Sequence, residues 1–450
     1  MSFQTIAQAA SALSAGSVTA TQLVEEALDR IGDPGGEGSR AFVSVQASQA
    51  RAAAQAMDAL RAAGRAPSIW AGIPISIKDL YDQAGEITRA GSVAREDASP
   101  ALATAPAVAR LERAGFIVLG RTNMSEFAFS GLGVNPHHGT PRSPWDRAVG
   151  RLPGGSSSGA GVATADGMGF AGLGSDTGGS CRIPAALCGI VGWKPTAQRV
   201  PLTGVLPLSS TLDSLGPLAR SVACCGLLDS VMSGEEMEQG DTVPAIRGLR
   251  LAVLEGYVAE GWDSHVTAAF ERALSRLSAA GARVERLMLP ELREIPAANA
   301  SGGFAAPEAW AWHRDLVARK REAYDPRILA RILRGEGMAA ADYVDLIQAR
   351  ARISAAIAQR TRAFDAVVMP TCPLIPPAIA EVEDEAAYNR INLLLLRNPS
   401  VANFLDRCAI SIPCHRPGDP PVGFMLMGER MGDRHLLATA AAAEAALADS

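Results

Sequence analysis

The sequence contains few of the features that direct a protein to nucleic acid or to a membrane. Its 42 Lys and Arg residues are outnumbered by 47 Asp and Glu residues, and no basic cluster stands out. Neither nucleic acid nor an anionic membrane surface is therefore expected as a partner. No run of about 18 uncharged, strongly apolar residues is present, which excludes a transmembrane helix. The N-terminal residues Met-Ser-Phe-Gln-Thr-Ile-Ala lack the basic and apolar regions of a signal peptide.

The positions of cysteine and histidine give no sign of a metal site. The chain has an odd number of cysteines, and no two of them form a C-x-x-C pair. The cysteines are Cys181, Cys188, Cys224, Cys225, Cys372, Cys408 and Cys414. Free thiols in a reducing compartment are expected, which indicates a cytoplasmic protein. His137 and His138 are adjacent, but no third metal-ligating side chain stands at a telling spacing. We therefore expect no metal and no other cofactor.

Length and pattern indicate an α/β protein. The 450 residues suffice for one large domain or for two or three ordinary ones, and a hydrophobic fraction of 48% supplies a sizeable core. Periodicity predicts a strand over 249–254, a helix over 264–280 and a strand over 284–289. That order is typical of two parallel strands joined by a helix.

Other segments are less regular. We expect a short helix over 122–129. Residues 187–220 are rich in Pro, Gly and Leu and show little periodicity. Residues 296–363 are predicted to be largely helical. Their aromatic side chains could either roof a pocket or pack in the core: Trp310, Trp312, Tyr324 and Tyr343.

Two glycine- and serine-rich segments lie close together, Gly154-Gly155-Ser156-Ser157-Ser158-Gly159 and Gly174-Ser175-Asp176-Thr177-Gly178-Gly179-Ser180. Glycine permits positive φ and a close approach of the backbone to a ligand. Such loops can direct several N–H groups at one developing negative charge. The second segment ends on Ser180, a candidate nucleophile, and a serine needs a base to take its proton.

Lys78 is the candidate for that base. The residues Gly72-Ile73-Pro74-Ile75-Ser76-Ile77 alternate in a way that predicts a strand, and Lys78 stands at its end. One interpretation is a solvated lysine at a strand edge. The other is a lysine in an apolar pocket, where desolvation lowers its pKa and allows it to act as a neutral base. The segment alone leaves both interpretations open.

Together these segments resemble the amidase signature family of serine hydrolases. The matching residues are Gly72-Ile73-Pro74 with Lys78-Asp79, both glycine–serine segments, Arg182-Ile183-Pro184-Ala185, Cys188-Gly189, Met124-Ser125-Glu126-Phe127-Ala128 and Pro144-Trp145-Asp146. The resemblance is densest over 70–220 and weaker towards the C-terminus. It implies an α/β fold in which a large mixed β-sheet is covered by helices on both faces.

The resemblance further implies a single amidase domain over residues 1–450. Its expected parts are an N-terminal helical part over 1–64, a signature core over 65–232, a helical insertion or cap over 296–363, and a C-terminal part over 364–450 that completes the core.

The resemblance implies a Ser–cis-Ser–Lys triad. Ser180 is then the nucleophile, Ser156 follows a cis peptide bond and relays the proton, and Lys78, neutral at rest, is the final base. The expected oxyanion hole consists of the backbone N–H groups of Thr177, Gly178, Gly179 and Ser180. The supporting residues implied around it are Asp176, Arg182 and Ser157.

The expected activity is hydrolysis of the C–N amide bond of a small, uncharged substrate through an acyl-enzyme. Carbamates (urethanes) and esters are further candidates because they share the carbonyl. We expect a pocket built from the loop 127–145 and the helical region 296–345, whose apolar and aromatic residues favour an uncharged substrate over a dicarboxylate. The protein is expected to be a monomer or homodimer.

Two other functions remain open. One is the glutamine amidase subunit of an amidotransferase complex, although Ser143, Phe424 and the segment 403–413 depart from the family's usual residues and favour a stand-alone hydrolase. The other is an α/β-hydrolase esterase, because Gly155-Ser156-Ser157-Ser158-Gly159 matches GxSxG. Ser157 would then be the nucleophile, with Asp365 and His415 or His435, but Lys78 would have no role.

Overall fold

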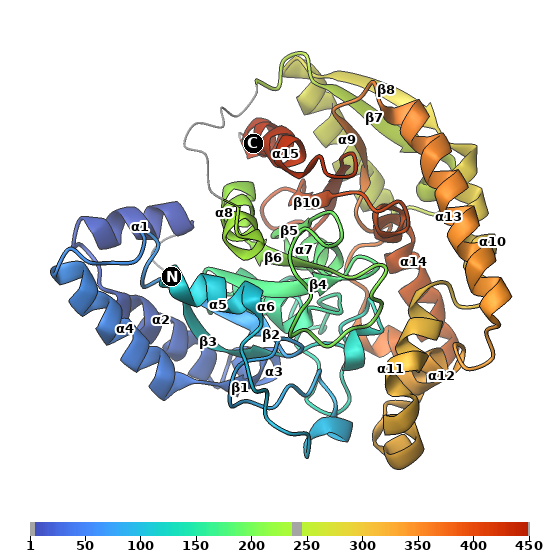
Figure 1. Cartoon of the computed structure of the whole chain (residues 1–450). Helices are drawn as coiled ribbons and strands as arrows, with labels where there is room; N and C mark the ends of the chain where they lie inside the picture. Colours follow the sequence, from blue (N-terminus) through green and yellow to red (C-terminus); the bar gives the residue numbers. More distant parts are fainter. Residues whose placement is uncertain (1–4, 236–244, 449–450) are drawn as a thin grey trace.

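The computed structural model describes residues 5–235 and 245–448, and within these ranges eleven strands form one mixed β-sheet (Figure 1). The order of the strands is β1-β3-β2-β4-β6-β5-β10-β11-β9-β7-β8. Their bounds are β1 Phe42–Val45, β2 Pro74–Lys78, β3 Ile117–Thr122, β4 Ala171–Asp176, β5 Val191–Lys194, β6 Ser214–Ala219, β7 Arg250–Glu255, β8 Arg283–Met288, β9 Ala366–Pro370, β10 Ala409–Pro413 and β11 Gly423–Met427.

Parallel pairs occur in two places in this sheet. Strand β2 lies between β3 and β4 and is parallel to both, while β7 is parallel to β8 and β9. The other pairs, which connect these two groups and add β1, are antiparallel. The parallel pairing of β7 with β8 confirms the unit predicted over 249–289.

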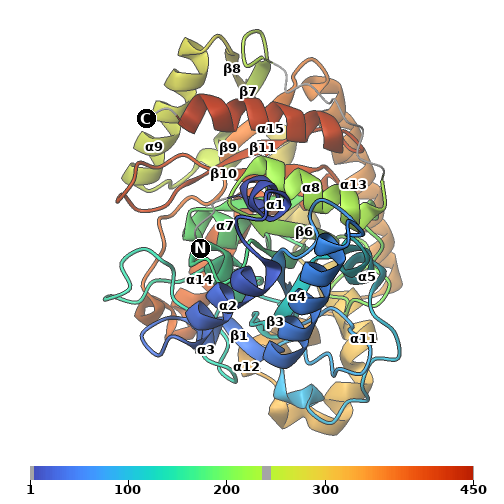
Figure 2. The same cartoon turned by 90° about the vertical axis from the view of Figure 1, so that its left-hand side faces the viewer.

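Helices pack on both faces of the sheet, so the expected α/β architecture is confirmed (Figures 1 and 2). Helices α8 and α15 contact each other and cover β5, β6, β10 and β11, whereas α6 and α7 pack on β2, β4 and β10 from the other side. The helices are α1 Ile6–Ser14, α2 Ala20–Gly32, α3 Gly38–Ala41, α4 Ala47–Ala62, α5 Pro106–Arg113, α6 Ser158–Ala165, α7 Arg182–Cys188, α8 Val222–Ser233, α9 Ser264–Ala279, α10 Ile295–Ala298, α11 Ala305–Lys320, α12 Pro326–Leu333, α13 Ala340–Thr361, α14 Glu385–Phe404 and α15 Asp433–Ala448.

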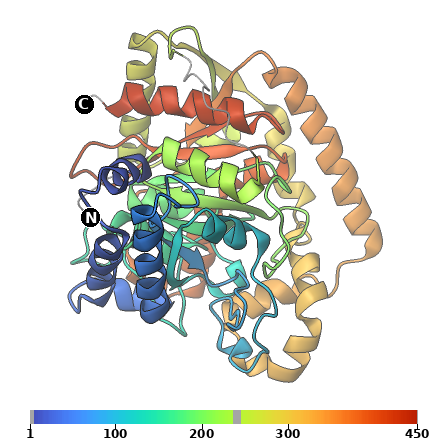
Figure 3. The same cartoon turned by 60° about the vertical axis from the view of Figure 1, so that its left-hand side comes forward.

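The first two helices begin at capping boxes. Thr5 and Thr19 accept the backbone N–H groups of Gln8 and Gln22, and each glutamine side chain accepts the N–H of its threonine. These reciprocal bonds satisfy donors that a helix start leaves free. Helix α1, dark blue in Figure 3, lies beside α8, and the Ile6 N–H donates to Cys224 Sγ at 3.3 Å.

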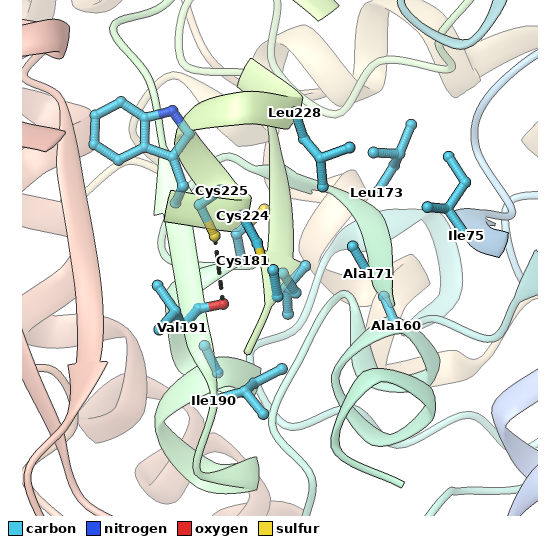
Figure 4. Close-up of a cluster of buried hydrophobic side chains, with 14 of the residues drawn as sticks. Ile75, Ala160, Ala171, Leu173, Cys181, Ile190, Val191, Cys224, Cys225 and Leu228 are labelled. Carbon is cyan, nitrogen blue, oxygen red and sulfur yellow. Dashed lines mark hydrogen bonds between the residues drawn. The ribbon is translucent and has the colours of Figure 1, made fainter. Parts of the chain in front are cut away.

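The core beneath the glycine–serine segments is made of small and branched apolar side chains. Figure 4 shows Ile75 of β2, Leu173 of β4 and Val191 of β5 facing Cys225 and Leu228 of α8. The Cys225 Sγ donates to the Val191 carbonyl at 3.9 Å. All seven cysteines are free thiols, six of them buried.

The helix predicted over 122–129 was wrong. Over 122–129 the structure has only one 3₁₀ turn, Glu126–Ala128, in which Phe127 has a φ of 50°. The turn is held by the buried Glu126, whose carboxylate accepts Ser92 Oγ and the Asp325 N–H. Residues 187–220, where the sequence shows little periodicity, contain strands β5 and β6. A strand buried on both faces shows no alternation of polar and apolar residues.

The helical region 296–363 was predicted correctly, and its aromatic side chains pack internally. Trp312 lies at 6.3 Å from Phe127 between ring centroids, and the Tyr324 ring lies at 5.1 Å from that of Phe127. The Tyr343 hydroxyl donates to Glu308 at 2.6 Å. No helix within 5–235 and 245–448 combines the length and apolarity that a membrane crossing requires.

Replacing Phe270 by Ala should lower the free energy of unfolding by about 3–5 kcal/mol, because the ring is fully buried and its loss leaves a cavity. Phe270 stacks on Phe424 of β11 at 5.1 Å between centroids. Urea denaturation followed by circular dichroism measures the change. Leu102→Ala, at a side chain that is 100% exposed, is the control and should change stability by less than about 0.5 kcal/mol. Equal effects of the two substitutions would contradict the assigned core.

Candidate active site

Lys78 is the last residue of β2 and is completely buried. Its Nζ donates to Ser156 Oγ at 2.7 Å and to Ser175 Oγ at 2.9 Å. The solvated interpretation of this lysine is therefore wrong. Because β2 and β4 are adjacent parallel strands, their carboxyl ends meet at one edge of the sheet, which brings Lys78 next to Ser175.

Burial controls the charge of this lysine. No carboxylate contacts Nζ within the described residues, and desolvation lowers the pKa of Lys78 from 10.5 to about 8. The carboxylates of Asp213 and Asp176 act in the opposite direction from a greater distance and prevent a larger decrease. A lysine with this pKa is neutral in about a tenth of the molecules near neutral pH, so it can accept a proton.

The first glycine–serine segment approaches Lys78 through Ser156. The peptide bond between Gly155 and Ser156 is cis. The Ser157 N–H donates to the Ser180 carbonyl at 3.3 Å, which ties this segment to the end of the second one. Gly155 has no room for a side chain, since a Cβ there would lie 2.5 Å from the Gly133 nitrogen.

The second segment is part strand and part turn. Gly174, Ser175 and Asp176 belong to β4, and the loop proper consists of residues 177–181 before α7. Ser180 is 3% exposed and lines a cavity of about 490 Å³. Thr177 and Gly178 line the same cavity. The structure thus brings Lys78, Ser156 and Ser180 into one region, with Ser180 facing the cavity.

The backbone N–H groups of the loop fall into two kinds. The Gly179 N–H donates to Asp176 Oδ1 at 2.8 Å, so its donor is already occupied. Those of Thr177, Gly178 and Ser180 have no acceptor within the part of the chain that the structure describes. Of the four donors expected for an oxyanion hole, Gly179 is therefore already bonded within the loop, and three N–H groups stay available.

A buried ion pair shapes the loop. The Asp176 carboxylate accepts Nε and an Nη of Arg182 at 3.0 and 2.9 Å, and also the Cys181 N–H at 3.1 Å. Asn403 of α14 completes the network, since it accepts Arg182 at 2.7 Å and donates to Asp176 at 2.9 Å. These bonds hold the pKa of Asp176 at about 2 despite burial.

A second carboxylate supports the loop from the other side. Asp213, just before β6, accepts the Thr177 hydroxyl, and its other oxygen accepts the N–H groups of Leu208 and Ser209 at 3.0 and 3.1 Å. Burial raises the pKa of Asp213 to about 6. The sequence did not reveal the contact of Asp213 with Thr177 or that of Ser175 with Lys78, because each joins residues that are far apart along the chain.

In the rival esterase site, the proposed nucleophile Ser157 contacts neither candidate histidine within the described residues. Ser157 is completely buried, and its Oγ donates only to the Ser175 carbonyl, at 3.4 Å. His435 pairs with Asp365 at 3.2 Å in an exposed position, and His415 Nδ1 accepts the Val422 N–H. No cluster of three His, Cys, Asp or Glu side chains that could hold a metal ion occurs in the described ranges. His137 instead bonds to Glu126 at 2.9 Å.

Comparison with known proteins decides the family. The Amidase family model matches residues 22–437. The chain belongs to the amidase family. The chain is 37% identical to a 2-amino-5-chloromuconic acid deaminase of Comamonas testosteroni. The match covers 90% of this chain and 88% of the deaminase. A glutamyl-tRNA(Gln) amidotransferase subunit of Chromohalobacter salexigens is 32% identical over 97% of this chain and 95% of its own length.

Solved structures agree. A crystal structure of an amidase superposes with a TM-score of 0.89, 31% identity and coverage of 99% of this chain and 100% of the other. The present protein is thus a hydrolase of carbon–nitrogen bonds with the amidase fold, as its motifs implied.

Replacing Arg182 by Met should lower the free energy of unfolding by about 3–5 kcal/mol, because Asp176 is then a buried charge without its partner. Chemical denaturation measures the loss. Arg293→Met, which breaks an ion pair with Glu260 whose side chains are 61% and 53% exposed, is the matched control and should cost at most about 1 kcal/mol. Similar costs for both variants would show that the buried pair does not hold the loop.

Proposed function

We propose that this protein hydrolyses amides through an acyl-enzyme on Ser180, with Ser156 as proton relay and Lys78 as final base. The observation that carries the proposal is the 2.7 Å contact between Lys78 Nζ and Ser156 Oγ in a completely buried setting, with Ser180 at the wall of the cavity. Neutral Lys78 can accept a proton along that contact.

In the proposed reaction, protons move between Ser180, Ser156 and Lys78 while the C–N bond is broken. Ser180 Oγ bonds to the substrate carbonyl carbon, its proton passes to Ser156, and the Ser156 proton passes to Lys78. The protons then return along the same path to the leaving nitrogen, and the C–N bond breaks. Water attacks the ester so formed, loses its proton to the same relay, and releases the acid and free Ser180.

The developing negative charge needs donors that are already in place. Those that support the proposal are the free N–H groups of Thr177, Gly178 and Ser180, in a loop fixed by Asp176 and Asp213. One such donor typically lowers the barrier by about 3–4 kcal/mol. Ser175 also contacts Lys78 and keeps Nζ directed at Ser156.

A second candidate is the glutamine amidase subunit of an amidotransferase, supported by the 32% identity to such a subunit over 97% of the chain. In that case the isolated chain would hydrolyse simple amides poorly. The identity to a 2-amino-5-chloromuconic acid deaminase, 37%, instead supports release of nitrogen from a small organic acid by a stand-alone enzyme. Turnover of small amides by the purified chain, with its mass from light scattering, separates the two.

Ser180→Ala, Ser156→Ala and Lys78→Ala should each lower kcat by about 10⁴-fold, because each removes one member of the proton path. Release of ammonia or amine from a panel of amides and urethanes measures activity. Mass spectrometry after a short reaction should show an acyl group on Ser180 in the parent enzyme.

Ser157→Ala is the matched control, a neighbouring buried serine with one long hydrogen bond, and should retain activity to within about tenfold. If Ser157→Ala alone abolished acylation, the nucleophile would be Ser157 and the proposed triad would be wrong.

The pH dependence should report Lys78. Because the neutral amine is the active form and its pKa is about 8, kcat/KM should rise about tenfold per pH unit in acid and level off above about pH 8. The profile of Ser157→Ala should coincide with that of the parent enzyme. A profile with no group titrating between about pH 7 and 9 would argue against a neutral lysine as the base.

A further inference from the structure

The cavity at Ser180 is more basic than the sequence indicated. It was expected to be apolar and aromatic, but its wall includes three arginines of or next to α12, Arg327, Arg331 and Arg334, and a single acid, Glu385 of α14. Helix α14, which was not expected to take part, lines the cavity next to α12, and Arg331 of α12 donates to Asn389 of α14 (Figure 1, where gold α12 lies beside orange-red α14). Most of the lining is apolar, as expected, so the three arginines form a charged patch in an otherwise apolar cavity.

Arg331 differs from its neighbour in having no counter-ion. Arg327 forms an ion pair with Asp325 at 2.9 Å. Arg331 donates to the Phe129 carbonyl at 2.8 Å and to Asn389 Oδ1 at 3.3 Å, and within the described residues no carboxylate lies at ion-pair distance from it. Burial lowers the pKa of Arg331, which nevertheless stays charged. A partly buried guanidinium without a counter-ion is costly unless an anion joins it.

A neutral donor stands in the same wall. Asn392 is 2% exposed, and its Oδ1 accepts the Gly131 N–H at 2.8 Å and the Ser130 hydroxyl at 3.1 Å. Ser130 in turn accepts the hydroxyl of Tyr388 at 2.8 Å. Because a backbone N–H occupies the carbonyl oxygen of Asn392, the amide orientation is fixed. Its Nδ2 has no acceptor in the part of the chain described, and Asn392 lines the cavity.

We infer that this cavity recognises amides whose acyl part carries a carboxylate, held by Arg331 and by Nδ2 of Asn392 while Ser180 attacks the carbonyl. Arginine offers a planar fork that matches a carboxylate, and Tyr388 places its ring 5.3 Å from the guanidinium carbon, which fixes the fork's plane. Glu385 in the same wall repels the anion and selects against a second negative charge near α14. The inference rests on the proposed amide hydrolysis at Ser180.

The test compares matched chromogenic anilides of several lengths. The purified enzyme is assayed with the succinyl, glutaryl and adipyl p-nitroanilides and with the uncharged butyryl, valeryl and hexanoyl p-nitroanilides. At one length or more, kcat/KM of the carboxylate substrate should exceed that of its uncharged match by about 10- to 100-fold. Hydrolysis without such a preference at any length overturns the inference and leaves the proposed function intact. No hydrolysis of either series, together with no acyl-enzyme, overturns both.

Substitutions of Arg331 and Glu385 test which residues produce the preference for the carboxylate substrate. In Arg331→Met the ratio of the two kcat/KM values at the preferred length should fall towards one, while Arg331→Lys keeps the charge and should retain part of the ratio. Glu385→Gln should raise the ratio, because it removes a repelling charge. Arg293→Met, at an exposed residue outside the cavity lining, is the control and should leave the ratio unchanged.

A purely structural role for Arg331 would lower both kcat/KM values in proportion and keep their ratio, which would overturn the assignment. Thermal unfolding of each variant shows whether the fold is intact. Where Arg331→Met does not fold, Arg331→Lys and Glu385→Gln decide the question by shifting the ratio in opposite directions.

Discussion

The burial of Lys78 against two serine hydroxyls is the interaction on which this site depends. Burying an ammonium group without a counter-ion costs free energy. Because Lys78 has no ion-pair partner within the described residues, this cost lowers its pKa. Asp176 and Asp213 are close enough to moderate the shift and are themselves engaged elsewhere, by Arg182 and by Thr177. A carboxylate in direct contact with Nζ would keep the lysine charged and remove its basicity.

The frame around that lysine is built from remote parts of the chain. Strands β2 and β4 bring Lys78 beside Ser175, and the Ser157–Ser180 backbone bond joins the two glycine–serine segments. Asn403 of α14 then closes the network around Asp176. The final third of the chain therefore completes the loop that carries Ser180, although the motif itself lies more than 200 residues earlier.

The groups proposed for the chemistry and those that line the cavity lie on different parts of the fold. The proposed chemical groups lie on strand ends and short turns that the sheet holds rigidly. Much of the remaining cavity wall comes from residues 302–306 and from α12 and α14, and its charge comes from the arginines of or next to α12 and from Glu385 of α14. Relatives named for an organic acid deaminase and for an amidotransferase subunit share the fold with this chain. Differences in such walls can change the substrate without disturbing the loop below.

The sequence by itself determined the family, most of the helices and strands, and the three residues proposed as the triad, but not Asp213, Arg331 or Asn392. These follow from local patterns, such as the alternation up to Lys78 and the two glycine–serine segments. It did not reveal β5 and β6, since strands buried on both faces lose the alternation that identifies them. It also allowed a helix at 122–129, where Glu126 is instead held by bonds to Ser92 and Asp325.

Only the tertiary structure decided that Lys78 is buried and that the Gly179 N–H donates to Asp176. It also decided that Arg331 and Asn392 line the cavity. Each of these depends on contacts between segments distant in sequence. A pKa, a free donor and the charge of a cavity are set by what surrounds a group in space, and residue order along the chain does not specify those surroundings.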